Sequence, residues 1–215
     1  YTPTSARGSS ATLNLTVTPS TNLTSVTVAS NTLFTSTIDG IQYKFTTRQP
    51  YVLLQSTGYT SNTISIKEGE PISQRFTVNT NNDGQRFVLG NPNIDTTTIK
   101  IRIQTSSSNT SLRTFTEASN LVDVSANSNV YFIQENENGK YELLFGDGVL
   151  GTALDNGNIV IADYNVVNGS ITNGANNFVS PSSIGGQASF TVSVANSAFG
   201  GANAESIPSI KFNAP

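Results

Sequence analysis

Short apolar runs with a two-residue period recur along the whole chain and constrain its fold more than any other feature. The alternation is present at residues 13–17, 41–45, 64–66, 76–78, 99–103 and 190–194. Successive side chains of a strand point to opposite faces, so this period predicts strands with one buried and one wet face. Thr and Val fill many positions between these runs, and β-branched residues suit a pleated sheet. The sequence predicts an all-β protein made of antiparallel β-sandwich-like units in two small domains, with little helix.

Turn dipeptides separate several of these runs. Asp39-Gly40 and Asn138-Gly139 each stand between two apolar runs, and both suit type I′ hairpin turns, which need positive φ at both central residues. Asp83-Gly84 predicts a further hairpin, with a longer loop, between residues 76–78 and 87–89. The one helix candidate, Ser111–Val124, lacks a sustained apolar stripe and good helix formers, so we expect at most a short helix there.

The spacing of the strands suggests an insertion. We expect residues 1–62 to form a first β domain that residues 166–200 complete, because the strong run near 190 needs a partner. Residues 63–165 would then be a second, inserted β domain, and 201–215 the start of a C-terminal region. The chain has no Met, so we expect it to begin inside a longer polypeptide.

Charge argues against nucleic acid and membrane partners. A net charge of −3 is spread thinly, and charged residues make up only 12% of the chain, so no basic stripe offers a phosphate site. No apolar run approaches the roughly 20 residues that cross a bilayer, so no membrane insertion is expected. Hydrophobic residues still reach 36% with regular spacing, which predicts a folded chain.

The absence of His and Cys narrows the possible chemistry. It excludes a Ser-His-Asp arrangement, a thiolate nucleophile and His- or Cys-ligated metal. The closest acidic pair, Glu135 and Glu137, could in principle serve a glycosidase, but it lies beside a hairpin turn where solvent opposes a raised carboxyl pKa. We therefore expect no catalytic residues and no enzyme.

A calcium loop and a phosphate loop are the remaining ligand motifs to weigh. Counting from Gln134, the segment places Phe145 at the twelfth position, where an EF-hand needs a bidentate Glu, and Gln134 itself replaces the first Asp. The Gly-rich string that starts at Phe145 lacks the following Lys and Ser/Thr of a P-loop. We therefore expect no metal and no cofactor.

The densest motif is Phe-Gly-Asp-Gly-Val-Leu-Gly, residues 145–151. Its glycines would supply backbone conformations closed to other residues, and Asp147 would bond neighbouring amides in an Asx-type turn. Phe145 and Leu150 would anchor the ends of the loop. The predicted structural motif consists of Phe145, Gly146, Asp147, Gly148, Gly151, Asn156 and Gly157.

These residues resemble a known family. The string Tyr141–Gly151, followed by Leu154–Ile159 and Tyr164, is similar to the FGDG stretch of baseplate J-like proteins, in particular the baseplate wedge subunits of T-even-like contractile-tailed phages. Three further places are similar to the same family in the same order. They are residues 6–11, residues 91–100, and residues 200–206 with 210–215.

The resemblance implies a virion structural protein in the tail baseplate, made in the host cytoplasm. It implies a homodimer of the parent protein, contacts with other baseplate wedge and hub proteins, and a part in sheath-contraction signalling. It also implies that an N-terminal helical part and a C-terminal dimerising part lie outside this fragment.

The alternative function is a glycan-binding adhesin or receptor-binding β module. In that case Tyr1, Tyr51 or Tyr59 would stack on a sugar. A carboxylate glycosidase is the third hypothesis, and its catalytic pair would be Glu135 and Glu137.

Overall fold

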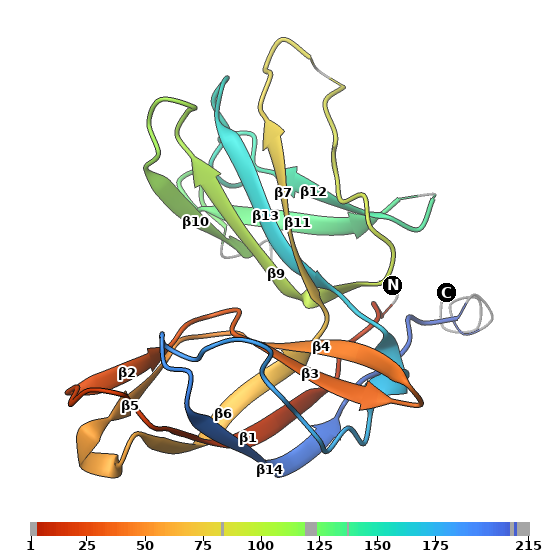
Figure 1. Cartoon of the computed structure of the whole chain (residues 1–215). Coiled ribbons are helices and arrows are strands. Elements are labelled where there is room, and N and C mark those ends of the chain that lie inside the picture. Colours follow the sequence, from red (N-terminus) through yellow and green to blue (C-terminus); the bar gives the residue numbers. More distant parts are fainter. Residues whose placement is uncertain (1–3, 83, 119–123, 137, 207–208, 210–215) are drawn as a thin grey trace. The chain divides into compact units, whose positions relative to one another are not determined.

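The chain folds into two compact all-β units (Figure 1). The structure, a computed structural model, describes residues 4–82, 84–118, 124–136, 138–206 and 209. Residues 72–92 and 96–164 form what we call the inserted unit, and residues 4–71, 93–95 and 165–206 form the flanking unit. The inserted arrangement is therefore present, but its first boundary lies after Pro71 rather than after residue 62.

The boundary moves because one predicted strand belongs to the flanking unit. That strand, β6 (Thr60–Glu68), pairs antiparallel with β1 (Ser10–Val17) and with β4 (Ile41–Thr47). At the other end of the chain Ala202 pairs with Arg7, so residues 201–206 also belong to the flanking unit rather than to a separate C-terminal region. Residues 207–208 and 210–215 lie outside the described residues.

The flanking unit contains a five-stranded sheet and a two-stranded sheet. The five-stranded order is β14-β1-β6-β4-β3, and the short sheet is β2-β5. The remaining bounds are β2 Ser25–Val28, β3 Leu33–Ile38, β5 Tyr51–Leu54 and β14 Phe190–Phe199, with short 3-10 turns at Gln55–Thr57 and Gly169–Thr172. All the strand pairs of this unit are antiparallel among the described residues.

The core of the flanking unit follows from the alternation in the sequence. On β1 every second residue is buried, including Leu13 and Leu15, which have no exposed surface. They pack with Phe34, Phe45 and Ile64 in one cluster of buried apolar residues. Burying each of these side chains stabilises the fold by roughly 1.5–3 kcal/mol relative to exposure.

The inserted unit is built on a seven-stranded sheet with the order β7-β13-β9-β10-β11-β12-β8. Its strands are β7 Glu70–Thr77, β8 Phe87–Val88, β9 Ile94–Gln104, β10 Leu112–Glu117, β11 Val130–Glu135, β12 Tyr141–Phe145 and β13 Ile159–Val166. One pair, β10 with β11, is parallel, unlike the antiparallel sheets that the sequence predicts.

Two local predictions in the inserted unit have different outcomes: the expectation of at most a short helix at Ser111–Val124 is not contradicted, whereas the Asp83-Gly84 hairpin is wrong. Residues 112–117 of the helix candidate form β10, which pairs with β9, because a long β9 offers it a backbone partner. Residues 119–123 of that candidate lie outside the described residues. The hairpin predicted around Asp83-Gly84 does not form, since β7 and β8 lie at opposite ends of the strand order. Asp83 itself is not described.

Side-chain amides link β7 to β8 where no backbone ladder does. Gln74 Nε2 donates to the Val88 carbonyl at 3.1 Å, and the Gly90 amide donates to Gln74 Oε1 at 3.2 Å. Gln85 Nε2 donates to the Thr77 carbonyl at 2.7 Å. These glutamines therefore satisfy backbone groups along the seam between the two terminal strands of the sheet.

The two NG and DG hairpins differ in their turns. Asp39 and Gly40 have φ values of 50° and 80°, and Ile38 pairs with Ile41, so this two-residue turn is the one the sequence predicts. The second hairpin does join β11 to β12, with Glu135 opposite Tyr141.

In the second hairpin the turn is longer than predicted. Only Gly139 of its dipeptide has positive φ, at 69°, so Asn138-Gly139 is not a type I′ turn. The amide of Asn136 donates to the Lys140 carbonyl, and Asn136 Oδ1 accepts from the amides of Asn138 and Lys140. The Asn136 side chain therefore organises the longer loop.

Candidate functional site

The FGDG loop connects β12 to the segment before β13, and its two ends are pinched together. Gly146 forms a backbone bridge with Ala153, and the Gly148 amide donates to the Gly151 carbonyl at 3.0 Å. Outside the loop, the Gly151 amide donates to the Ser125 carbonyl at 3.1 Å. The loop is thus held by backbone hydrogen bonds at its base and from one flank.

Asp147 shapes the tip of the loop through its carboxylate. Its Oδ1 accepts hydrogen bonds from the amides of Val149 at 2.9 Å and Leu150 at 3.0 Å, the Asx-type geometry that the sequence predicts. These backbone hydrogen bonds lower the pKa of the Asp147 carboxyl below its ordinary value. The ionised Asp147 carboxylate therefore stabilises the turn, and both of its hydrogen bonds are made to residues of the loop itself.

The three glycines are required for two different reasons. Gly148 and Gly151 have φ values of 88° and 90°, in the left-handed region that favours glycine. Gly146 is not in that region, but a Cβ on it would overlap the backbone of Gly151. Close approach of two backbone segments, rather than φ, explains this glycine.

The loop presents apolar side chains to solvent at its tip. Val149 is 73% exposed and Leu150 is 46% exposed, so the expectation that Leu150 anchors the loop is wrong. Phe145 does anchor it, because its ring makes edge contacts with Phe87 at 5.4 Å and with Phe115 at 5.9 Å between centroids. The hydrogen-bonded loop thus holds two apolar side chains away from the core.

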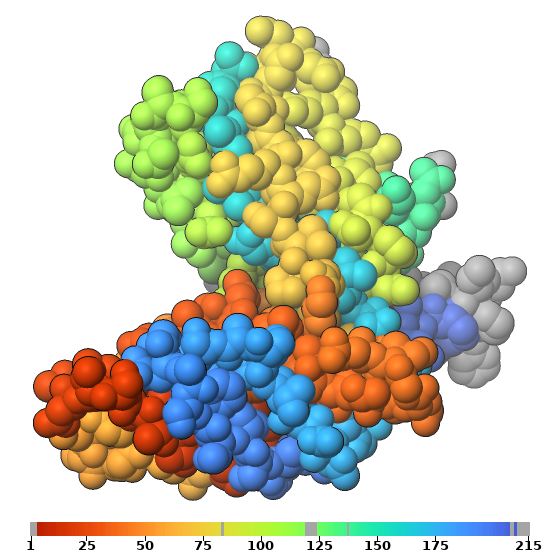
Figure 2. All heavy atoms as spheres, in the orientation of Figure 1, coloured from red at the N-terminus to blue at the C-terminus, as the bar shows by residue number. Residues whose placement is uncertain are grey.

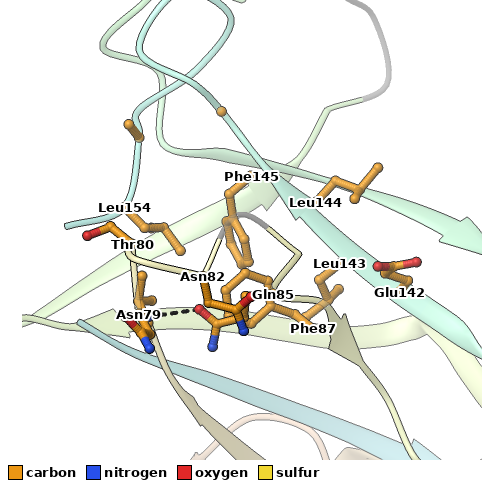
Figure 3. A pocket seen from close by; sticks show the side chains of 13 residues that line it. Asn79, Thr80, Asn82, Gln85, Phe87, Glu142, Leu143, Leu144, Phe145 and Leu154 are labelled. Atoms are coloured by element: carbon orange, nitrogen blue, oxygen red, sulfur yellow. Dashed lines mark hydrogen bonds between the residues drawn. The ribbon is translucent and has the colours of Figure 1, made fainter. Parts of the chain in front are cut away.

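A hollow of about 320 Å³ lies next to the base of the loop within the inserted unit (Figure 3). Amide side chains and apolar groups line it from residues 78–87, from β12 and from Ala153 and Leu154. Figure 3 shows the Phe145 side chain pointing toward Gln85 and Phe87, whereas that of Leu144 points away.

Glu142 is the one ionisable side chain among the described lining residues, and it is already paired. Arg86 donates to both of its carboxylate oxygens, through Nε at 2.7 Å and through Nη2. The hydrogen bond with Arg86 lowers the pKa of Glu142, and a bond from Gln134 acts in the same direction. The hollow is therefore lined by amide groups and aromatic edges, and the charge of Glu142 at its wall is neutralised by Arg86.

The other predicted motif residues secure the turn before β13. Gly157 has a φ of 82° and donates its amide to the Val78 carbonyl at 2.9 Å, and Asn156 Oδ1 accepts from the Thr80 amide at 3.2 Å. Sequence reasoning missed the buried Asn158, whose Nδ2 donates to the Thr105 carbonyl at 2.9 Å. Its place in an Asp-Asn-Gly-Asn turn was the available signal.

A buried polar network in the flanking unit was also missed. Asp95 and Glu68 are both fully buried. Asp95 Oδ2 accepts from the Gly8 amide at 3.0 Å and pairs with Lys67 Nζ at 2.9 Å. Asn168 donates to Glu68 through its side chain at 2.7 Å and through its backbone amide.

Desolvation dominates at Glu68 and raises its carboxyl pKa above the ordinary value, although the hydrogen bonds from Asn168 act in the opposite direction. The network joins segments distant in sequence, which explains why no local pattern revealed it.

Two contacts in the flanking unit join three segments that are distant in sequence. Residues 6–11 meet residues 91–100 through the Gly8–Asp95 hydrogen bond. Residues 6–11 meet residues 200–206 through Arg7 and Ala202, which exchange two backbone hydrogen bonds at 2.8 and 3.0 Å. These segments thus form one structural junction within the flanking unit.

The alternative sites fit the described geometry poorly. Glu135 is exposed at the end of β11, and Glu137 is not described. Tyr59 donates its hydroxyl to the Leu23 carbonyl at 2.6 Å, and the Tyr51 hydroxyl accepts from the Ser65 amide at 3.0 Å, while both rings pack against the core. Tyr1 is not described. The structure brings together no group of three or more Asp or Glu residues that could hold a metal ion, within its described part.

No family model matches the sequence, and no curated protein matches it. Across the described part of the chain, no helix is long and apolar enough to span a membrane.

Proposed function

We propose that the chain is a non-catalytic scaffold of a contractile phage tail baseplate, where it works through protein-protein interfaces. The observation that carries the proposal is the hydrogen-bonded FGDG loop that exposes Val149 and Leu150. Exposed apolar side chains on a preorganised loop lose little conformational entropy when a partner covers them. Such a loop suits assembly better than catalysis.

The charges of the two units favour the same role. Arg86 neutralises the acid at the hollow, Lys67 pairs with buried Asp95, and Asn168 hydrogen-bonds Glu68. Each of these carboxylates is engaged in holding the fold. Such internal contacts stabilise a structural subunit, whereas a hydrolase needs a carboxylate that can contact its substrate.

The family resemblance gives the scaffold its proposed place. It suggests a position among baseplate wedge and hub proteins in the virion, with the parent protein as a dimer. The meeting of three motif segments at the Gly8–Asp95 junction gives those motifs a common structural purpose. We propose that this junction keeps the flanking unit intact while the baseplate changes state.

The test has two arms. Antibodies raised against the purified chain should label the baseplate end of contractile tails in electron micrographs of the phage that encodes it. In that phage, replacing Val149 and Leu150 with Ser should reduce the yield of complete baseplates. Replacing Ile41, which is 58% exposed in the flanking unit, with Ser is the matched control and should leave the yield unchanged.

Absence of label from tails would refute the proposed place. Equal yields for the loop variant and the control would remove the loop from the assembly contacts.

The hollow favours one alternative, a glycan-binding module. Asn79, Asn82 and Gln85 line it together with Phe87, and amides beside an aromatic ring are groups that bind sugar hydroxyls and ring faces. Micromolar binding on a glycan array that is lost in Asn82→Leu would favour this function over the scaffold.

A further inference from the structure

The outer edge of β14 has unpaired backbone groups. This strand is the last of the five-stranded sheet, next to β1 (Figure 1). The Thr18 amide donates to the Ser189 carbonyl, and the register continues with Thr16 opposite Thr191. Since hydrogen-bonded pairs alternate in an antiparallel ladder, the intervening residues of β14 turn their backbone groups away from β1.

Three residues therefore form the unpaired edge. The amide and carbonyl groups of Phe190, Val192 and Val194 face outward, and no described residue forms a hydrogen bond with them. Further along, the edge is covered, because Ala198 exchanges backbone hydrogen bonds with Gly174 and Ala175 at 2.7 and 2.8 Å. The open part of the edge is thus residues 190–194.

The side chains of the same three residues are incompletely covered. Phe190, Val192 and Val194 pack against the core cluster but are only partly buried. Leu13 and Leu15 on the neighbouring strand have no exposed surface. A further strand beside β14 would pair the backbone groups and also bury these apolar side chains.

This region carries no charge. Residues 8–38 and 169–204, which include both β1 and β14, contain no Asp, Glu, Lys or Arg. Segments from residues 169–204 lie on the surface shown in blue in Figure 2. Natural sheets protect exposed edges with charged side chains or Pro, and residues 190–194 have neither.

The other strands at sheet edges are protected. β7 carries Glu70, Pro71 and Arg75; β8 has two residues; β2 and β5 have four each; and β3 is paired at Thr35 with Val179. The unprotected stretch of β14 is therefore an exception among the described strands and calls for a specific partner.

We propose that β14 pairs antiparallel with β14 of a second copy of the chain about a two-fold axis at Val192. In this register Val192 lies opposite the partner's Val192, and Phe190 lies opposite the partner's Val194. Every outward amide then meets an outward carbonyl, and apolar side chains meet apolar side chains on one face. The two five-stranded sheets become continuous.

A second copy suits this edge better than a charged segment of another protein. A charged partner would bury its charge against residues that offer no opposite charge, whereas two copies of this uncharged edge do not repel each other. Pairing along residues 190–194 would bury less area than the roughly 800 Å² per partner of a stable interface. We therefore expect a weak dimer, with a Kd of roughly 10–500 μM. The inference does not depend on the baseplate proposal, since it rests on backbone geometry and charge.

A charge-swap experiment tests both the partner and the register. Val192→Lys and Val192→Glu would each place like charges opposite each other at the two-fold axis, and a mixture of the two variants would place opposite charges there. We expect sedimentation velocity to show a concentration-dependent dimer for the parent, monomers for each variant alone, and a dimer for the equimolar mixture. Val52→Lys, at a residue 60% exposed on β5, is the control and should dimerise like the parent.

Thermal unfolding and circular dichroism would verify that every variant is folded. If either Val192 variant fails to fold, Val194→Pro replaces it, because Pro removes one outward amide while Val194→Ala keeps it. We expect Val194→Ala to dimerise and Val194→Pro to stay monomeric. A parent that is monomeric at 1 mM would overturn the proposal. So would a mixture no more dimeric than its separate components, or a Val194→Pro variant as dimeric as Val194→Ala.

Discussion

Replacing Gly146 with Ala should destabilise the inserted unit more than replacing Gly148, although only Gly148 has positive φ. The added Cβ at Gly146 would overlap the carbonyl carbon and oxygen of Gly151, and neither is the end of a flexible side chain. At Gly148 the nearest atom to the new Cβ is the Ala153 Cβ, at an ordinary 3.9 Å. The two substitutions thus separate backbone overlap from backbone strain.

The magnitudes follow from these contacts. At Gly148 an alanine in the left-handed region costs about 1–2 kcal/mol, partly offset by a less flexible unfolded chain, so we expect a net loss near 1 kcal/mol. At Gly146 the base of the loop must open. That opening loses the Gly148–Gly151 hydrogen bond and the bridge to Ala153, and it strains the packing nearby. We expect a loss of about 2–4 kcal/mol.

Calorimetry of the whole chain and amide exchange provide the assay. A loss of 2 kcal/mol or more should lower the melting temperature of a unit this size by roughly 10 °C. If the loop opens without unfolding the unit, the loss appears instead as faster exchange of the Val149 and Leu150 amides, which bond to Asp147. Gly146→Ala that melts and exchanges like the parent, or that costs less than Gly148→Ala, would refute the reasoning.

Three further predictions test the polar contacts. Burial raises the pKa of the Glu68 carboxyl, so the stabilising contribution of Glu68 is complete below the ordinary value of 4.5 and is lost as pH rises through the folded pKa. Glu68→Gln should therefore raise the melting temperature at pH 7 and leave it unchanged near pH 4. An equal shift at both pH values would contradict this prediction. The contact with Arg86 lowers the pKa of Glu142, so the stabilising contribution of Glu142 is present above pH 4.5 and is lost as pH falls through the folded pKa. In urea unfolding, Arg86→Ala should lower the free energy of unfolding by about 1 kcal/mol at pH 7 and by almost nothing near pH 2. A loss that does not depend on pH would show that packing, and not charge, is responsible. Asp147→Asn keeps an acceptor for the loop amides and should melt closer to the parent than Asp147→Ala does; identical melting of the two variants would show that an uncharged acceptor at this position does not stabilise the turn.

Features that depend on neighbouring residues were predictable from the sequence. The alternation at residues 13–17 and 190–194 predicts β1 and β14, because the period of a strand is local. Asp39-Gly40 predicts its turn, since only a few dipeptides adopt positive φ at both positions. The Asp147 turn was predictable for the same reason, as its carboxylate bonds amides two and three residues away.

Features that depend on distant partners were decided by the tertiary structure. An alternating strand can pair with any other, so nothing near Asp83 indicates that β7 and β8 lie at opposite ends of one sheet. Nor does the sequence reveal that Leu150 faces solvent, because its burial depends on whether another segment covers the loop.

The contact between Gly8 and Asp95 shows the division most clearly. The sequence supplies a glycine, which leaves room for the Glu68 carbonyl, and an acid, which can accept the amide hydrogen bond. Whether the two residues meet depends on strand order across 87 positions of chain. Local chemistry determines which strands and turns this chain can form, whereas the burial of apolar faces in three dimensions selects which of them pair.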